Sequence, residues 1–258
     1  MGAPIAVLSA YGLHYVGGVG SGHVSADYYG VFASKLGQRL GATSTIPAFV
    51  AAMANGTSGD INNINFRTPR EGLPPYGQIN RVAEDLSVEV ARVVKSLKYD
   101  DHVSLDAKTA EIILNVRQPS TEELTRAESI LTAARGKPLV GLEEFYARET
   151  TLLAKFPARV PVTLQALRIG KLGIAAIPCE VFAEIGLEIK EKSRLQPAFT
   201  IELANGYNGY LPTKAQHARG GYETWRARSS YLEVDAAEKI TQTILDLMEQ
   251  LNKQAPKP

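Results

Sequence analysis

The chain has 258 residues, of which 45% are hydrophobic and 21% are charged, and its formal net charge is +1. This length suits one large domain or two small ones with a sizeable buried core. A charge near zero, with basic residues scattered along the chain, argues against a nucleic-acid or anionic-membrane partner. The single cysteine, Cys179, excludes an internal disulfide framework. No apolar run in the sequence reaches the length of a transmembrane segment.

The N-terminal part of the chain predicts alternating strands and helices. Residues 4–10 are apolar apart from one serine, as in a buried strand, and a glycine-rich loop follows them. Ser25 has the residue type of an N-cap for a helix that runs to about residue 40. We expect a second buried strand at 46–53 and a long helix at 78–97, with a surface loop rich in proline and glycine between them.

The first residues read as this strand and not as a leader. Residues 1–11 have no positively charged region and no cleavage-site pattern, so they do not predict a signal peptide. A domain rarely opens in the middle of a sheet without a preceding segment. We therefore expect the domain to be incomplete at its N-terminus, with sheet neighbours of the first two strands missing.

The rest of the chain predicts more strands and helices of the same domain. We expect a strand at 102–117 with a break near Asp106, helices at 121–134, 142–153 and 181–194, a hairpin at 162–177 that turns at Gly170-Lys171, a strand at 198–204 and a terminal helix at 234–251. Residues 252–258 are expected to form a disordered tail. Since no repeat or linker is visible, residues 1–258 predict a single α/β domain, a mixed β-sheet layered with helices.

Four predicted strands deliver polar side chains directly after their apolar runs. The first strand leads to His14, the second to the loop 55–63, the hairpin to Glu180, and the last strand to Tyr207 and Tyr210. Ligand sites of α/β sheets lie beyond the carboxyl ends of strands. The pattern therefore predicts one site built from these groups.

Each of these residues also has an ordinary structural interpretation. A single histidine such as His14 is more often hydrogen-bonded than metal-bound, and Glu180 could be a helix N-terminal carboxylate. Asn55-Gly-Thr fits a weak glycosylation sequon, and Tyr210 could be a half-buried packing residue. Cys179 lies in an apolar setting and is expected to be a small core residue, not a nucleophile.

Five segments occur together in the order found in one enzyme family. They are Tyr11–Gly18, Val24–Gly30, Asn55–Asn63, Ile177–Phe182, and Leu203–Thr213 followed by Gly221–Glu223. In these segments the chain resembles the neutral/alkaline ceramidases, the zinc-dependent N-acylsphingosine amidohydrolases, and in particular their bacterial branch. The resemblance does not extend to residues 70–160. It implies a zinc amidohydrolase-like catalytic domain.

The resemblance implies a single Zn²⁺ held by two histidines, a glutamate and a tyrosine. His14 matches the second histidine, Glu180 the glutamate and Tyr210 the tyrosine of this family. Cys179 stands where the family has glycine. An imidazole, a carboxylate and a phenol oxygen are suitable ligands for Zn²⁺ and leave a position for water.

The resemblance also implies roles for residues around the metal. Tyr222 matches a tyrosine that steadies the substrate carbonyl, and Asp27 matches an aspartate that could orient the site. Asn62 replaces a serine with a catalytic or substrate-orienting role; its amide is no nucleophile but can donate a hydrogen bond. Further substrate-binding or supporting residues are expected at Asn55, Asp60 and Tyr207.

The family's first zinc histidine lies in a Thr-His-Thr-His-Ser segment, which the chain does not contain. We therefore expect the chain alone to bind zinc weakly and to be a poor enzyme. If it bound zinc tightly, another of its histidines would complete the site. His23, on the glycine-rich loop nearest His14, is the first candidate, before His102 and His217.

The resemblance implies a hydrolase that cleaves the amide bond of an N-acyl lipid, such as a ceramide, with water activated by zinc. It also implies that the full-length parent is exported, while the residues themselves leave the compartment and oligomeric state open. Two alternatives are a binding module that keeps the fold without catalysis and a hydrolase of a different amide or ester. Zinc content and a substrate panel distinguish them.

Overall fold

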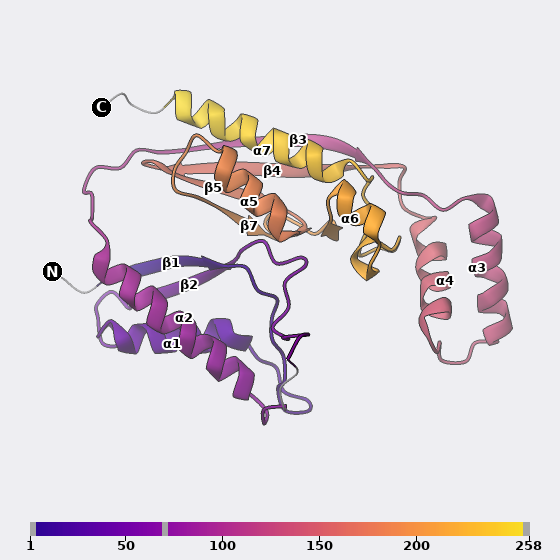
Figure 1. Cartoon of the computed structure of the whole chain (residues 1–258), viewed down its shortest axis with the longest axis horizontal. Coiled ribbons are helices and arrows are strands. Elements are labelled where there is room, and N and C mark those ends of the chain that lie inside the picture. The colour runs from indigo at the N-terminus through magenta and orange to yellow at the C-terminus, as the bar shows by residue number, and fades with distance from the viewer. Residues whose placement is uncertain (1–3, 69–71, 255–258) are drawn as a thin grey trace. The chain divides into compact units, whose positions relative to one another are not determined.

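A computed structural model of the chain describes residues 4–68 and 72–254. The chain forms two compact units, residues 1–103 and 104–258. Each unit combines strands with helices that lie against them (Figure 1). This arrangement confirms the predicted α/β class with sheets layered against helices, whereas the single domain with no linker stays a prediction.

The first unit is a pair of parallel strands covered by two helices. Its elements are β1 (Ala6–Tyr11), α1 (Asp27–Arg39), β2 (Val50–Asn55) and α2 (Gly77–Ser96). β1 and β2 pair from Ala6↔Val50 to Tyr11↔Asn55. Tyr28 and Phe32 of α1 pack with Ile79 of α2 in a small core. Because β1 and β2 are parallel, their carboxyl ends and the loops after them lie side by side.

Two boundaries of the first unit differ from the sequence prediction. Ser25 is not the N-cap of α1, which begins at Asp27 after Ala26; the Ser25 hydroxyl instead accepts a hydrogen bond from the Asp27 amide at 3.0 Å. β2 begins at Val50, later than predicted, because Pro47 has no amide hydrogen for a sheet bond. Part of the predicted surface loop, residues 69–71, lies outside the described residues.

The second unit is built on a four-stranded mixed sheet with the order β3-β4-β5-β7. The strands are β3 (Leu105–Asn115), β4 (Arg159–Ile169), β5 (Leu172–Ile177) and β7 (Ala198–Glu202). The first three pair antiparallel and the last pair is parallel. A short parallel pair, β6 (Glu180–Val181) and β8 (Tyr210–Leu211), follows the sheet.

Helices cover and extend this sheet (Figure 1). They are α3 (Thr121–Ala134), α4 (Leu142–Leu153), α5 (Ala183–Lys192), α6 (Lys214–Arg219), the 3-10 turn η1 (Tyr222–Thr224) and α7 (Ala236–Lys253). α7 packs along β3, β4 and β5, while α3 and α4 pack on one another. No described helix combines the length and the apolar character needed to cross a bilayer.

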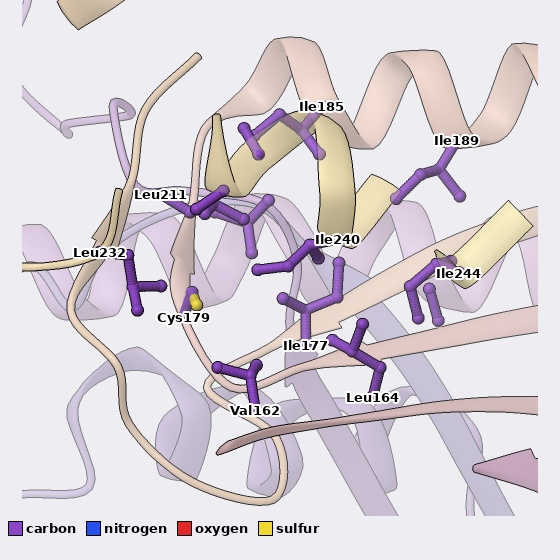
Figure 2. Packing of buried hydrophobic residues seen from close by; sticks show 14 of the residues in the cluster. Val162, Leu164, Ile177, Cys179, Ile185, Ile189, Leu211, Leu232, Ile240 and Ile244 are labelled. Carbon is purple, nitrogen blue, oxygen red and sulfur yellow. The ribbon is translucent and has the colours of Figure 1, made fainter. Parts of the chain in front are cut away.

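The core of the second unit lies between the sheet and the helices α5 and α7 (Figure 2). Leu164 and Ile177 of the sheet meet Ile240 of α7 and Ile189 of α5 there, and all four are fully buried. Cys179 belongs to the same cluster, and burial raises the pKa of its thiol. The interpretation of Cys179 as a core residue is therefore confirmed.

Several predicted elements of the second unit are confirmed, and three details are wrong. Val181 belongs to β6, so the helix predicted at 181–194 begins at Ala183 as α5 and ends at Lys192. The bounds of α3 and α4 agree with the prediction, and the hairpin turns at Gly170-Lys171. β3 has no break at Asp106, which pairs in register with Arg168 and lies 3.9 Å from its guanidinium. Asn252 and Lys253 belong to α7 and not to a disordered tail, while residues 255–258 lie outside the described part.

Candidate functional site

His14 lies in the first unit, three residues after the end of β1. Its Nδ1 is 3.2 Å from the hydroxyl of Ser58, which is fully buried in the loop after β2. The side-chain amide of Asn55 in turn donates to the same hydroxyl at 3.2 Å. A hydrogen-bond partner at one ring nitrogen restrains the orientation of the imidazole and leaves the other nitrogen available to a ligand.

The close approach of the two loops depends on a glycine. A Cβ atom at Gly12 would lie 2.6 Å from the carbonyl oxygen of Thr57, so a larger residue would push the loops apart. The amide of Gly56 also donates to the carbonyl of Tyr11 at 2.8 Å, which extends the β1–β2 pairing beyond the strands. Strand pairing thus carries the Asn55–Ser58 segment next to His14.

Asp27 holds the loop that follows His14. Its buried carboxylate accepts hydrogen bonds from the amides of Val16 at 3.0 Å and Gly17 at 2.8 Å, and from Tyr28 at 2.7 Å. The first two of these bonds fix the backbone just beyond His14. This geometry fits an orienting residue that acts through the loop and not by direct contact with the imidazole.

The other candidates of the first unit lie in the loop after β2. Asn55 is the last residue of β2 and is partly buried, while Asp60 and Asn62 are exposed. The amide of Ile61 donates to the carbonyl of Ser58 at 2.9 Å, which turns the chain between them. The loop therefore presents polar side chains near His14 within the same unit.

Glu180 and Tyr210 lie side by side in the second unit. They are register partners on the parallel strands β6 and β8, and the amide of Glu180 donates to the carbonyl of Gly209 at 2.9 Å. The hydroxyl of Tyr207 donates to the Glu180 carboxylate at 2.9 Å. The structure thus brings three predicted site residues together, although they are separated by about thirty positions in the sequence.

Buried polar contacts support this pair of short strands. The carboxylate of Glu202, which is 3% exposed, accepts from the Val181 amide at 2.8 Å and holds β6 against the end of β7. Gly209 has a φ of 75°, and a Cβ atom there would lie 2.4 Å from the carbonyl oxygen of Ser229. A glycine is therefore needed directly before Tyr210.

Tyr222 reaches the same cluster from η1. Its ring meets that of Tyr210 edge-on, with 5.8 Å between centroids and 88° between planes, and its side chain is 52% exposed. Burial, the hydrogen bond with Tyr222 and the negative charge of Glu180 raise the pKa of Tyr210. Burial and Glu180 likewise raise the pKa of Tyr207. The cluster is the Glu180 carboxylate with three phenol side chains gathered around it.

The predicted zinc ligands belong to both units. Glu180 and Tyr210 lie together in the second unit, and His14 is in the first. Within residues 4–68 and 72–254, no three side chains of histidine, cysteine, aspartate and glutamate are grouped as a metal site of these types alone would require. The predicted ligand set differs from such a group because it includes a tyrosine.

The remaining histidines have other surroundings. Nδ1 of His23 is 2.7 Å from the hydroxyl of Tyr76, and the side chain of His102 is 90% exposed beside Asp101. His217 lies on α6, where burial and the charge of Arg117 lower its pKa. His23 lies in the same unit as His14. Its role as a further zinc ligand stays a prediction.

Sequence reasoning missed three residues that position these groups. Ser58 lies inside the Asn55–Asn63 motif but was not singled out, although its neighbours were. Glu202 is a charged residue at the end of an apolar strand, which signals a buried polar contact. Arg117 follows β3 in the part of the chain without a recognised motif and donates to two backbone carbonyls.

Two solved ceramidase structures resemble this chain. The neutral ceramidase from Pseudomonas aeruginosa matches with a TM-score of 0.67 and 16% identity over 98% of this chain and 45% of its own. A ceramidase complexed with C2 matches with a TM-score of 0.69 and 15% identity over 98% of this chain and 46% of its own. No family model and no curated protein sequence matches. The chain thus spans less than half the length of these ceramidases and has a ceramidase-like fold.

Proposed function

We propose that the protein is a zinc-dependent hydrolase that cleaves the amide bond of an N-acyl lipid such as a ceramide. The observation that carries this proposal is the cluster of Glu180, Tyr207, Tyr210 and Tyr222 in a chain with a ceramidase-like fold. A carboxylate beside a phenol supplies two ligand types for a metal, and a second phenol beside them supplies a hydrogen-bond donor.

The residues fit the metal that the proposal requires. We assign His14, Glu180 and Tyr210 as zinc ligands, because neutral imidazole, carboxylate and phenol oxygen suit Zn²⁺. Glu180 and Tyr210 already adjoin on paired strands. When bound, zinc lowers the pKa of a water to about 7 and polarises a carbonyl. The hydrogen bonds of Tyr207 to Glu180 and of Ser58 to His14 would hold these two ligands in place.

The chain's other residues would bind and orient the substrate amide. The hydroxyl of Tyr222 would donate to the oxygen of the amide carbonyl as negative charge develops there. Asn62 would donate a second hydrogen bond through its side-chain amide, in the place of a family serine. Burial, the hydrogen bond with Tyr222 and the negative charge of Glu180 raise the pKa of Tyr210, so that this phenol is protonated at neutral pH in the absence of metal.

Zinc affinity tests the ligand assignment. We expect Glu180→Gln and Tyr210→Phe each to weaken zinc binding by at least about tenfold, as even supporting residues of metal sites do. Glu184→Gln is the matched control, because Glu184 is four residues away on α5 and bonds the Thr213 hydroxyl. Equal affinity in Glu180→Gln and the control, measured by titration with zinc and a chromophoric competitor, would remove Glu180 from the site.

A substrate panel distinguishes the proposed function from its alternatives. The panel contains an N-acyl sphingoid base, an N-acyl amino acid and a fatty-acid ester, each with the same fluorescent acyl chain. Cleavage of the first alone supports a ceramide-like substrate. Preference for either of the others indicates a different amide or ester hydrolase. Binding of zinc and lipid without turnover on any substrate indicates a non-catalytic module.

A further inference from the structure

We propose that Arg117 is a positioning residue that holds Tyr222 against Tyr210. This inference rests on the function proposed above, in which Tyr222 contacts the substrate carbonyl. Arg117 lies two residues after the end of β3 and is hydrogen-bonded to the segment 222–231. This segment begins with η1 and ends beside the residues that follow β3. It contacts neither Tyr222 nor a proposed zinc ligand in any described hydrogen bond, so its effect would be transmitted through this segment.

Arg117 fastens the segment at both ends. One terminal nitrogen, Nη1, donates to the carbonyl of Thr224 at 2.9 Å. The other, Nη2, donates to the carbonyl of Ser230 at 2.6 Å and to its hydroxyl at 2.8 Å. The backbone amide of Arg117 also donates to the carbonyl of Tyr231 at 2.7 Å. A single residue thus fixes the start and the end of the turn that carries Tyr222.

Tyr222 stands in a tight turn that is closed by hydrogen bonds on its downstream side. Upstream, Gly220 and Gly221 have φ values of 81° and 111°, and a Cβ atom at Gly220 would meet nothing within 4 Å. Downstream, the amide of Trp225 donates to the carbonyl of Tyr222 at 3.2 Å, and Thr224 bonds back to Gly221. Because η1 is a tight turn, the point at which Arg117 holds Thr224 also fixes Tyr222.

The chemistry of arginine suits this task better than that of lysine. A guanidinium is a rigid fork whose two ends reach separate acceptors, whereas an ammonium is a single point of charge. Burial and the neighbouring Arg226 lower the pKa of Arg117 to about 10, so that it is still protonated at neutral pH. Its Nε has no partner among the described residues. The described hydrogen bonds of the guanidinium therefore all go to the segment 222–231.

The experiment follows Tyr222 directly, without use of activity. 3-Fluorotyrosine is placed at position 222 and its ¹⁹F resonance is recorded in the parent protein, in Arg117→Lys and in Arg168→Lys. Arg168 is the matched control, since it is also a buried arginine of the same unit and donates to the carbonyl of Gly170, at the other end of β3 and β4. Circular dichroism establishes that each variant is folded.

We expect the resonance to shift or broaden in Arg117→Lys and to stay unchanged in Arg168→Lys. An unchanged resonance in a folded Arg117→Lys would overturn the inference, as would an equal shift in both variants. If Arg117→Lys does not fold, Ser230→Ala replaces it, since this variant removes one acceptor of Arg117 and should shift the resonance less in the same direction. An unmoved resonance in Ser230→Ala would then count against the inference.

A double-mutant cycle adds the functional test. If the protein hydrolyses the N-acyl lipid, Arg117→Lys should lower kcat by about tenfold to a hundredfold with little change in KM, as a small misplacement does. In a Tyr222→Phe background the same change should lower kcat by less than about twofold further. A full additional loss there would show a role separate from Tyr222. If the unmutated full-length protein, including any segment upstream of this chain, has no turnover, the proposed function fails, and the resonance still decides the role of Arg117.

Discussion

The two units differ in how deeply their strands are buried. In the second unit β5 is buried along almost its whole length, between α5 and α7 and its neighbouring strands. In the first unit the buried residues of the hydrophobic core come from α1, α2 and Leu13, and the strands contribute only partly buried side chains to it, such as Val7 and Met53. Parallel strands are normally covered on both faces. The first unit is therefore held together chiefly by its helices.

This contrast can be measured because the single tryptophan, Trp225, lies in the second unit. Its ring packs edge-on against Tyr146 of α4, with 5.2 Å between centroids. Tryptophan fluorescence therefore reports the unfolding of the second unit, while far-ultraviolet circular dichroism reports helices of both. A difference between these two signals during denaturation would show that the two units unfold separately.

The largest effect is expected from the core of the second unit. Ile240→Ala removes a fully buried side chain between α7 and the sheet and should lower the free energy of unfolding by about 2–5 kcal/mol. Urea unfolding followed by Trp225 fluorescence measures this loss. Leu187→Ala on α5 is the control, since Leu187 is 63% exposed and should change stability little. Similar losses in both variants would contradict the assigned core.

A smaller effect is expected from the glycine that precedes Tyr210. Gly209→Ala combines a positive φ with a Cβ atom 2.4 Å from the Ser229 carbonyl, so it should cost about 1–3 kcal/mol and displace Tyr210 from Glu180. Gly220→Ala has a similar φ of 81° but open space around the Cβ. It should cost about 1 kcal/mol. Equal stability of the two variants would mean that the loop yields without strain.

The sequence predicted α3, α4, α5, α7 and the main sheet of the second unit because local signals define them, whereas the short helix α6 was not predicted. The Ser120 capping box marks the start of α3, and the alternating apolar pattern with Gly170 marks the hairpin. His14, Glu180 and Tyr210 were expected to form one site because each follows the end of a predicted strand, and of these Glu180 and Tyr210 adjoin on β6 and β8. These short strands were not predicted, since a two-residue pairing has no periodicity.

The division into two units left no comparable signal in the sequence. The boundary falls between Val103 and Ser104, and no run of glycine, serine or proline marks it, so composition alone gives no boundary. The positioning residues were missed for a related reason. Ser58 and Glu202 act through single hydrogen bonds between segments that are distant in the chain, and such contacts depend on tertiary structure.

A pH effect of about 1 kcal/mol is expected where α4 meets the segment 222–231. Hydrogen bonds from Arg228 hold the pKa of Glu149 below its usual value. A lowered carboxyl pKa stabilises the fold above the unfolded value of about 4.3 and loses this effect as pH falls through the folded pKa. The stability difference between the parent and Arg228→Ala should therefore be present at neutral pH and vanish well below pH 4.

The exposed pair Arg92–Glu89 of α2 supplies the comparison from the first unit. Its carboxyl pKa is also lowered by a hydrogen bond from its arginine, but both side chains are more than half exposed, so solvent screens the interaction. Arg92→Ala should therefore change stability less than Arg228→Ala at neutral pH, where both carboxylates are charged. A larger effect of Arg92→Ala would mean that exposure does not decide the strength of these pairs.

The smallest effect on stability, and the sharpest test of the contrast, comes from the uncovered face of β1 and β2. Leu8 and Val50 are 53% and 58% exposed, on the face opposite to Val7. Leu8→Lys should leave the free energy of unfolding within about 0.5 kcal/mol and reduce self-association at high concentration, because apolar sheet surfaces and edges promote aggregation. Light scattering against concentration measures this. Val7→Lys, which faces the helices, should destabilise the first unit instead, and a Leu8→Lys variant as unstable as Ile240→Ala would mean that this face is packed and that the contrast between the units is wrong.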